Sequence, residues 1–170
     1  MELPDELRLP QPGARVRAMR ADDWVLEQAL SRVPDVPPWT YYPADLSPQG
    51  ARDRVAHSLA LRAQGRGARF VVESAGDPVG MVGLELRTEV PSVFYAFLPA
   101  GRGAGFATAA VRAVSGWVLA QGAAEVRAST MLDNAASERV LERASFRRDG
   151  TDVGPDGVVV TRWVNKPTDE

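Results

Sequence analysis

A glycine-rich loop between two regular elements is the part of this sequence best suited to chemistry. An apolar run of strand length ends at Leu98, and the next ten residues read Pro-Ala-Gly-Arg-Gly-Ala-Gly-Phe-Ala-Thr. An amphipathic helix then extends to Gln121. Main-chain N–H groups and the positive end of a helix dipole converge at such a junction, and glycines let a phosphate approach the main chain without a Cβ in the way. The loop therefore predicts a phosphate-binding site.

The spacing of the loop glycines excludes two nucleotide-binding motifs. A dinucleotide site requires G-x-G-x-x-G, and neither Gly101 nor Gly103 begins such a run. A Walker P-loop requires a lysine that this loop lacks. The pattern that remains is Arg102-x-x-Gly105-x-Ala107. A glycine-rich turn with an ordinary helix cap is the alternative interpretation of the same residues.

A second candidate motif follows the next predicted strand. Asn134 suits a helix N-cap, Ser137 lies in the first turn, and Phe146 follows the helix. The two motifs together resemble those of the GNAT N-acetyltransferases, notably the RimJ/RimL-like branch. That family carries [Q/R]-x-x-G-x-[G/A] in its loop and N-x-x-S-x-x-[VL]-[LM]-x-x-x-G-F in its helix, and the resemblance covers about residues 68–164. Ser145 stands where the family usually has glycine.

The resemblance implies acetyl-CoA as the acyl donor and assigns most of its contacts to the loop. A main-chain N–H near Phe97 or Leu98 is expected to face the thioester oxygen. Asn134 and Ser137 are expected beside the CoA arm, with Ser137 as the proton donor to the leaving thiolate; a plain helix cap and a first-turn polar residue are the alternative. The loop residues expected to contact the cofactor are Arg102, Gly103, Ala104, Gly105, Phe106, Ala107 and Thr108.

The implied reaction is direct attack of a primary amine on the thioester, because the sequence contains no cysteine to carry the acyl group. Glu85 is the candidate general base, on the strand beside the one that would bind CoA. Alternatively, and with equal weight, Glu85 is an outward-facing carboxylate between Leu84 and Leu86. Glu73 and Glu89 are weaker candidates for the general base. No metal is expected.

The acceptor site is expected in a proline-rich segment, where this family builds it. Trp39, Tyr41 and Tyr42 could form an aromatic wall there, or could pack in the core under a long loop. Tyr95 matches the family's G-Y-W-x-x-P strand and is assigned to the pocket floor. The acceptor is either a protein N-terminal α-amine or a small amine such as an aminoglycoside or polyamine. A catalytically silent CoA-binding or sensing module is the alternative function.

Composition bounds these hypotheses. The chain has 170 residues, 45% hydrophobic and 25% charged, with a net charge of −2 and one histidine. One domain over residues 1–170 suits this length. The charge gives no general attraction to nucleic acid, no apolar run has membrane-spanning length, and the acidic start is no signal peptide, so a cytoplasmic protein is expected. The oligomeric state stays open, with a homodimer as one option.

The regular elements predict one α/β (α+β) domain. A strand–helix–strand crossover at the loop implies one parallel pair among otherwise antiparallel strands. The resemblance to GNAT enzymes implies a mixed, mostly antiparallel twisted sheet of about six to seven strands flanked by about four helices. Residues 1–13 are expected to be a loose arm, and residues 34–43 to lack regular structure. The predicted strands span residues 15–20, 68–74, 79–87, 92–98, 125–130, 146–149 and 158–164, and the predicted helices about 22–31, 48–64, 109–121 and 135–143.

Overall fold

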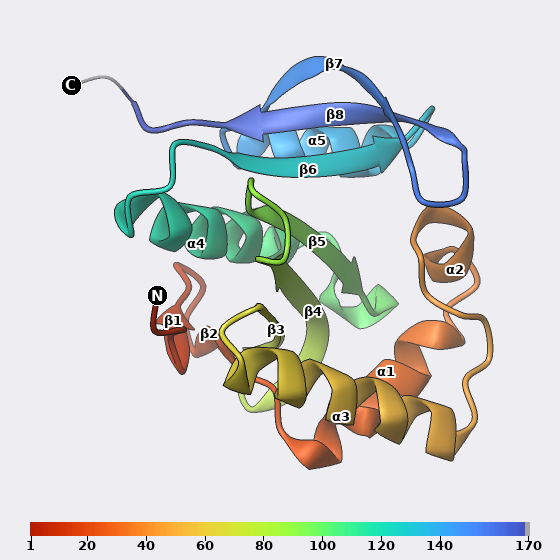
Figure 1. Cartoon of the computed structure of the whole chain (residues 1–170). Coiled ribbons are helices and arrows are strands. Elements are labelled where there is room, and N and C mark those ends of the chain that lie inside the picture. Colours follow the sequence, from red (N-terminus) through yellow and green to blue (C-terminus); the bar gives the residue numbers. More distant parts are fainter. Residues whose placement is uncertain (169–170) are drawn as a thin grey trace.

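Eight strands form one sheet in the computed structural model, which describes residues 1–168 (Figure 1). Their order is β1-β2-β3-β4-β5-β6-β8-β7, and only β5 and β6 pair in parallel. The strands are β1 (Glu6–Arg8), β2 (Ala14–Ala18), β3 (Gly67–Ser74), β4 (Asp77–Glu85), β5 (Ser92–Phe97), β6 (Val126–Met131), β7 (Arg147–Val153) and β8 (Val159–Asn165). The mixed, mostly antiparallel sheet is confirmed, with eight strands where six to seven were expected.

Helices cover both faces of this sheet. They are α1 (Trp24–Ser31), α2 (Val36–Trp39), α3 (Pro48–Ala63), α4 (Phe106–Ala120) and α5 (Ala135–Arg143), with 3-10 turns η1 (Ala21–Asp23) and η2 (Pro99–Gly101). Ser47 caps α3 by accepting a hydrogen bond from the Gly50 N–H at 3.0 Å. None of the helices within residues 1–168 is long and apolar enough to cross a membrane.

Helix α2, the one helix beyond the four predicted, lies in the proline-rich segment that was expected to be irregular. Pro37 and Pro38 are the second and third residues of its single turn. A proline fits there because the first N–H groups of a helix have no partner within that helix. The prediction for this segment was therefore wrong in detail: the prolines start a short helix and do not prevent one.

Two hydrophobic cores lie on the two faces of the sheet. Consecutive residues of a strand point to opposite faces, so Phe70 packs with α4 while its neighbour Val71 packs with α1 and α3. The α4 core also contains Val111, Val118 and Trp163, which are almost completely buried. The α1 and α3 core is smaller. The sheet is thus held from both sides, and its central strands are fixed in position.

The N-terminal residues are not the loose arm that was expected. Strand β1 pairs with β2, and Leu9 is buried in the α4 core. The turn between these strands reaches the glycine-rich loop, where the Gln11 side-chain Nε2 donates to the Ala104 carbonyl oxygen at 3.0 Å. The N-terminal hairpin therefore supports that loop from behind.

Strands β5 and β6 separate soon after they meet. Their pairing is limited to Ser92 with Arg127, where the Arg127 N–H also donates to the Pro91 carbonyl oxygen at 2.8 Å. From this point the two strands diverge toward their carboxyl ends, where α4 and α5 begin (Figure 1). The sheet therefore has two arms, β1–β5 and β6–β8, joined at one end and apart at the other.

Candidate functional site

The glycine-rich loop presents a row of free main-chain donors at the open end of the two arms. Gly103 and Gly105 have φ values of 84° and 79°, in the left-handed region that favours glycine. Helix α4 begins at the next residue, Phe106. Within residues 1–168 the N–H groups from Gly103 to Thr108 have no hydrogen-bond partner, whereas that of Ala109 bonds to the Gly105 carbonyl oxygen. Such a row at a helix N-terminus suits a pyrophosphate.

The Arg102 side chain joins this loop to the segment before α2. Its guanidinium donates to both carboxylate oxygens of Asp35, at 2.7 and 2.8 Å, and to the Phe97 carbonyl oxygen at 3.0 Å. The hydrogen bonds from Arg102 hold the pKa of Asp35 below its usual range. The predicted contact of Arg102 with the cofactor stays a prediction, because here the guanidinium binds a carboxylate of the protein.

The end of β5 offers one free N–H toward the gap between the arms. The Leu98 N–H donates to the Val79 carbonyl oxygen on the β4 side, at 3.0 Å. Because N–H groups alternate in direction along a strand, that of Phe97 points away from β4 and toward β6. Of the two residues predicted to face the thioester oxygen, the geometry favours Phe97.

The start of α5 brings Ser137 to β5 across the gap. The Asn134 side-chain oxygen accepts from the Ser137 N–H at 3.2 Å, so the predicted N-cap is confirmed. The Tyr95 hydroxyl lies 2.5 Å from Ser137 Oγ and 3.2 Å from the Ser137 carbonyl oxygen. Burial raises the pKa of Tyr95 to about 12. Tyr95, predicted on the pocket floor, packs beside the α4 core and contacts Ser137 there.

Glu85 lies at the closed end of the two arms. It pairs with Ser92, five residues and so roughly 17 Å along β5 from Phe97. Arg87 Nε donates to its two carboxylate oxygens at 2.9 and 2.8 Å. Burial acts to raise the pKa of Glu85, but the bonds from Arg87 outweigh it and the pKa is lowered. Position and weak basicity both speak against Glu85 as the general base.

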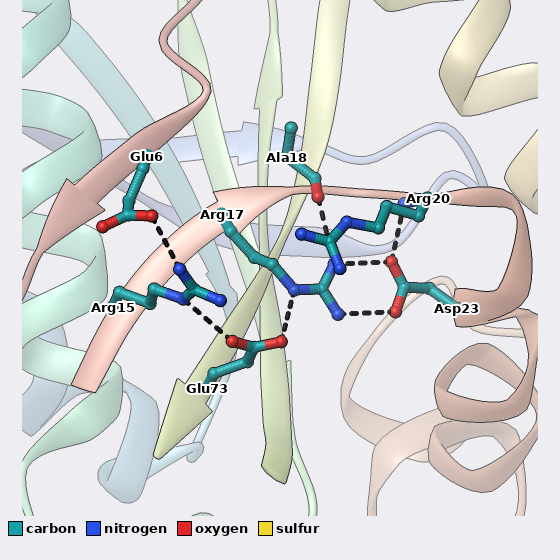
Figure 2. A network of polar contacts seen from close by, with 7 residues as sticks. All are labelled: Glu6, Arg15, Arg17, Ala18, Arg20, Asp23 and Glu73. Carbon is teal, nitrogen blue, oxygen red and sulfur yellow. Dashed lines mark hydrogen bonds and ion pairs between the residues drawn. The ribbon is translucent and has the colours of Figure 1, made fainter. Parts of the chain in front are cut away.

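Glu73, a weaker candidate base, belongs to a buried ionic network (Figure 2). Its carboxylate accepts from Arg15 at 2.9 Å and from Arg17, and Arg17 in turn donates to both oxygens of Asp23 at 2.8 Å. Burial acts to raise the pKa of Glu73, but the bonds from Arg17 and Arg15 lower it. The network joins β2 and β3 to the start of α1, and it leaves Glu73 a structural role.

The three aromatic residues predicted as an acceptor wall divide into two groups. Trp39 and Tyr41 are 41% and 55% exposed, but Tyr42 is only 6% exposed and lies in the α1 and α3 core. A Cβ added to Gly154 would collide with the Tyr41 hydroxyl oxygen, so the Tyr41 side chain touches the β7–β8 turn. Trp39 and Tyr41 remain candidates for the acceptor site, whereas for Tyr42 the structure supports the alternative, packing in the core, and not a place in the acceptor wall.

Sequence reasoning missed two acidic residues. Asp35 holds the glycine-rich loop through Arg102, as described above. Glu27 on α1 is completely buried and pairs with Arg54 at 3.4 Å and Arg69 at 3.5 Å. Its position three residues before Leu30, on the buried face of α1, could have indicated a paired carboxylate.

Comparison with known proteins agrees with this geometry. Residues 14–147 match the sequence profile of the family described as "Acetyltransferase (GNAT) domain". No curated protein matches the chain.

Similar solved structures share the fold at low sequence identity. RimL, described as the ribosomal L7/L12 alpha-N-protein acetyltransferase and solved with coenzyme A, is 16% identical over 95% of this chain and 97% of that chain, with a TM-score of 0.79. RimJ of Mycobacterium smegmatis is 20% identical over 95% and 85%, with a TM-score of 0.75. The aminoglycoside acetyltransferase AAC(6')-Ib, solved with coenzyme A and kanamycin, is 20% identical over 90% and 94%, with a TM-score of 0.75. Because the family profile covers most of the chain, this protein belongs to the GNAT acetyltransferase family.

Proposed function

We propose that this protein is an N-acetyltransferase that uses acetyl-CoA to acetylate a protein N-terminal α-amine. The observation that carries the proposal is the row of free N–H groups from Gly103 to Thr108, at the open end of the diverging strands β5 and β6. The pyrophosphate would bind this row, and the acyl arm would extend between the two strands toward Ser137. The coenzyme A complexes of RimL and AAC(6')-Ib support this choice of acyl donor.

The chain's own groups then serve the transfer. Acetyl-CoA supplies the acyl group as a thioester. The Phe97 N–H would donate to the thioester oxygen as negative charge develops there. The Ser137 hydroxyl would donate to the sulfur as the C–S bond breaks. A covalent acyl-cysteine is not available because the sequence has no cysteine.

The state of the carboxylates supports an α-amine as the acceptor. Glu73 and Glu85 are both held by arginines, and the pKa of each is lowered, so both are weak bases. An α-amine has a pKa of about 7.7–8.0 and is roughly one-tenth neutral near pH 7, whereas a lysine amine of pKa about 10.4 is almost entirely charged. An α-amine therefore needs the least help in losing its proton. RimL, named for α-N acetylation, supports the same choice.

A thiol-release assay with acetyl-CoA tests this function. The panel contains peptides with a free N-terminus, the same peptides with a blocked N-terminus and an internal lysine, aminoglycosides and polyamines. We expect thiol release only with free α-amines. Release only with aminoglycosides or polyamines would replace the proposed acceptor class. Binding of CoA by calorimetry without release from any amine would instead indicate a silent CoA-binding module.

A further inference from the structure

The contact between Tyr95 and Ser137 is a feature of the site that the mechanism above leaves unused. Tyr95 comes from β5 and Ser137 from α5, so their hydroxyls meet across the two arms of the sheet at 2.5 Å. A second distance, 3.2 Å from the Tyr95 hydroxyl to the Ser137 carbonyl oxygen, offers the tyrosine proton another acceptor. Ser137 itself is only half-buried.

The protons of the Tyr95 and Ser137 hydroxyls can be arranged in two ways that keep a hydrogen bond between the two side chains. In the first, Ser137 donates to Tyr95 while Tyr95 donates to the Ser137 carbonyl oxygen. In the second, Tyr95 donates to Ser137 Oγ, and the serine proton is free to point at a third group. Only the second arrangement can serve a negatively charged acceptor outside the pair.

We infer that Tyr95 is a positioning residue that donates to Ser137 Oγ and thereby directs the serine proton at the sulfur of the leaving group. The inference rests on the proposed function. The amine nitrogen forms the new C–N bond, the C–S bond breaks, and the electron pair of that bond leaves on sulfur. The amine's proton goes to solvent. Ser137 and Tyr95 keep their protons and stabilise the thiolate by hydrogen bonding alone.

Hydrogen bonding without proton transfer follows from the acidities. A thiol has a pKa of about 8.5, whereas burial raises the pKa of Tyr95 to about 12. A proton moved from the pair to the thiolate would therefore run uphill. The tyrosine stays neutral throughout and acts only as a fixed donor.

A double-mutant cycle tests the inference through turnover. Ser137→Ala should lower kcat by about 10²-fold, because it removes a hydrogen-bond donor to developing negative charge. Tyr95→Phe should lower it by about 3- to 10-fold, because the serine hydroxyl then rotates among its three staggered positions. The CoA dissociation constant should stay within about twofold in both variants, since the loop amides are untouched. In the Ser137→Ala background, Tyr95→Phe should have no further effect. The inference would be overturned if the loss of kcat in the double variant equalled the product of the two single losses. An unchanged kcat in Tyr95→Phe alone would overturn it too.

A second measurement does not depend on turnover. Ultraviolet absorbance of the thiolate follows the titration of CoA bound to the protein. A directed donor at sulfur should lower the pKa of the bound thiol by about one unit below 8.5, and Tyr95→Phe should reverse most of this shift. Identical titrations in the parent and in Tyr95→Phe would refute the role of Tyr95. The amine panel tests the function itself, so the two failures are distinguishable.

The control for lost stability is Ser58→Ala. This buried α3 hydroxyl accepts from the Arg69 N–H at 3.2 Å and lies outside the site. It should lower the melting temperature about as much as Tyr95→Phe while leaving kcat and the CoA thiol titration unchanged.

Discussion

The proposed cofactor side and the proposed acceptor side of this molecule are built from different groups. On the proposed cofactor side, the free main-chain amides around Gly103 and Gly105 would form the binding surface. On the proposed acceptor side, the exposed rings of Trp39 and Tyr41 would form the surface, and the Asp35–Arg102 ion pair holds the start of the segment that carries them. A main-chain site depends on where glycines stand in one short stretch. A side-chain site depends on where distant loops come to rest.

The largest effect is expected from a substitution in the glycine-rich loop itself. Gly105→Glu should weaken CoA binding by more than about 100-fold, because a carboxylate and its side chain would stand where the pyrophosphate approaches. The residue also has a φ of 79°, which strains any side chain. Calorimetric titration with CoA, with circular dichroism to verify the fold, measures the effect.

Two controls separate charge, bulk and strain in this experiment. Gly105→Gln has nearly the same bulk without the charge and should bind CoA better than Gly105→Glu. Gly122→Glu adds the same side chain at another left-handed position, φ 94°, at the far end of α4. It should leave CoA affinity unchanged. Equal CoA affinity in Gly105→Glu and the parent would show that the phosphate binds elsewhere.

The buried network that joins β2 and β3 to the start of α1 should affect stability and not cofactor affinity. Glu73→Gln leaves Arg17 with Asp23 as its remaining ionic partner, and it should lower the free energy of unfolding by about 3 kcal/mol. Urea denaturation measures this, and CoA affinity should stay within about twofold. As a control, Glu85→Gln breaks a more exposed pair with Arg87 and should cost less than about 1 kcal/mol.

The same carboxylate predicts how stability depends on pH. The pKa of Glu73 is lower in the folded protein than in the unfolded chain, where it is about 4.3. Its contribution is therefore fully present above about pH 4.3 and is lost as the pH falls through the folded-state pKa. The melting temperature of the parent should fall more steeply below pH 4.3 than that of Glu73→Gln. If the melting temperatures of the parent and of Glu73→Gln fell equally steeply below pH 4.3, Glu73 would not stabilise the fold through its charge.

The link between the two sides should give a smaller effect. Asp35→Asn weakens a half-exposed ion pair, worth up to about 1 kcal/mol, and should raise the acceptor KM by about two- to fivefold. CoA affinity should not fall, because the loop amides are unchanged. Asp45→Asn is the matched control, because it breaks the exposed Arg32–Asp45 pair, which also lies in the chain between α1 and α3. If Asp35→Asn weakened CoA binding and left the acceptor KM unchanged, the pair would belong to the cofactor side.

The smallest expected effect concerns a main-chain conformation held without glycine. Ser145, after α5, has a φ of 72°, at the position where the family usually has glycine. Ser145→Gly should remove about 1–2 kcal/mol of strain, part of which is offset by the greater entropy of the unfolded chain. The melting temperature should rise by about 1–3 °C. A fall would mean that the serine side chain stabilises this turn.

The same contrast explains what could be predicted from the sequence. The glycine-rich loop and the Asn134 cap are local, so a few residues in order were sufficient to predict them. The loop's row of N–H groups needed only the position of α4 and two glycines. Most helices and strands were predicted for the same reason, since hydrophobic periodicity and capping residues are local signals.

Features that depend on distant contacts could not be predicted in this way. Strand β1 has three residues, and its pairing with β2 gives no periodic signal. Glu85 alternates with apolar residues, but its distance from Phe97 depends on the register of β4 with β5. Tyr42 was a candidate for the acceptor wall with its neighbours, yet the guanidinium groups of Arg54 and Arg69, which come from α3 and β3, lie over its ring.

The divergence of β5 from β6 also sets how quickly individual amides exchange with solvent. Along β5, amides that point to β4 are held in the antiparallel ladder, whereas those that point to β6 have no strand opposite them beyond Ser92. In deuterium oxide, the amides of Ala96 and Leu98 should therefore exchange slowly, and those of Tyr95 and Phe97 much faster. The strand would show an alternating pattern of protection in the free protein, and an acyl arm bound against its open side would even out that pattern.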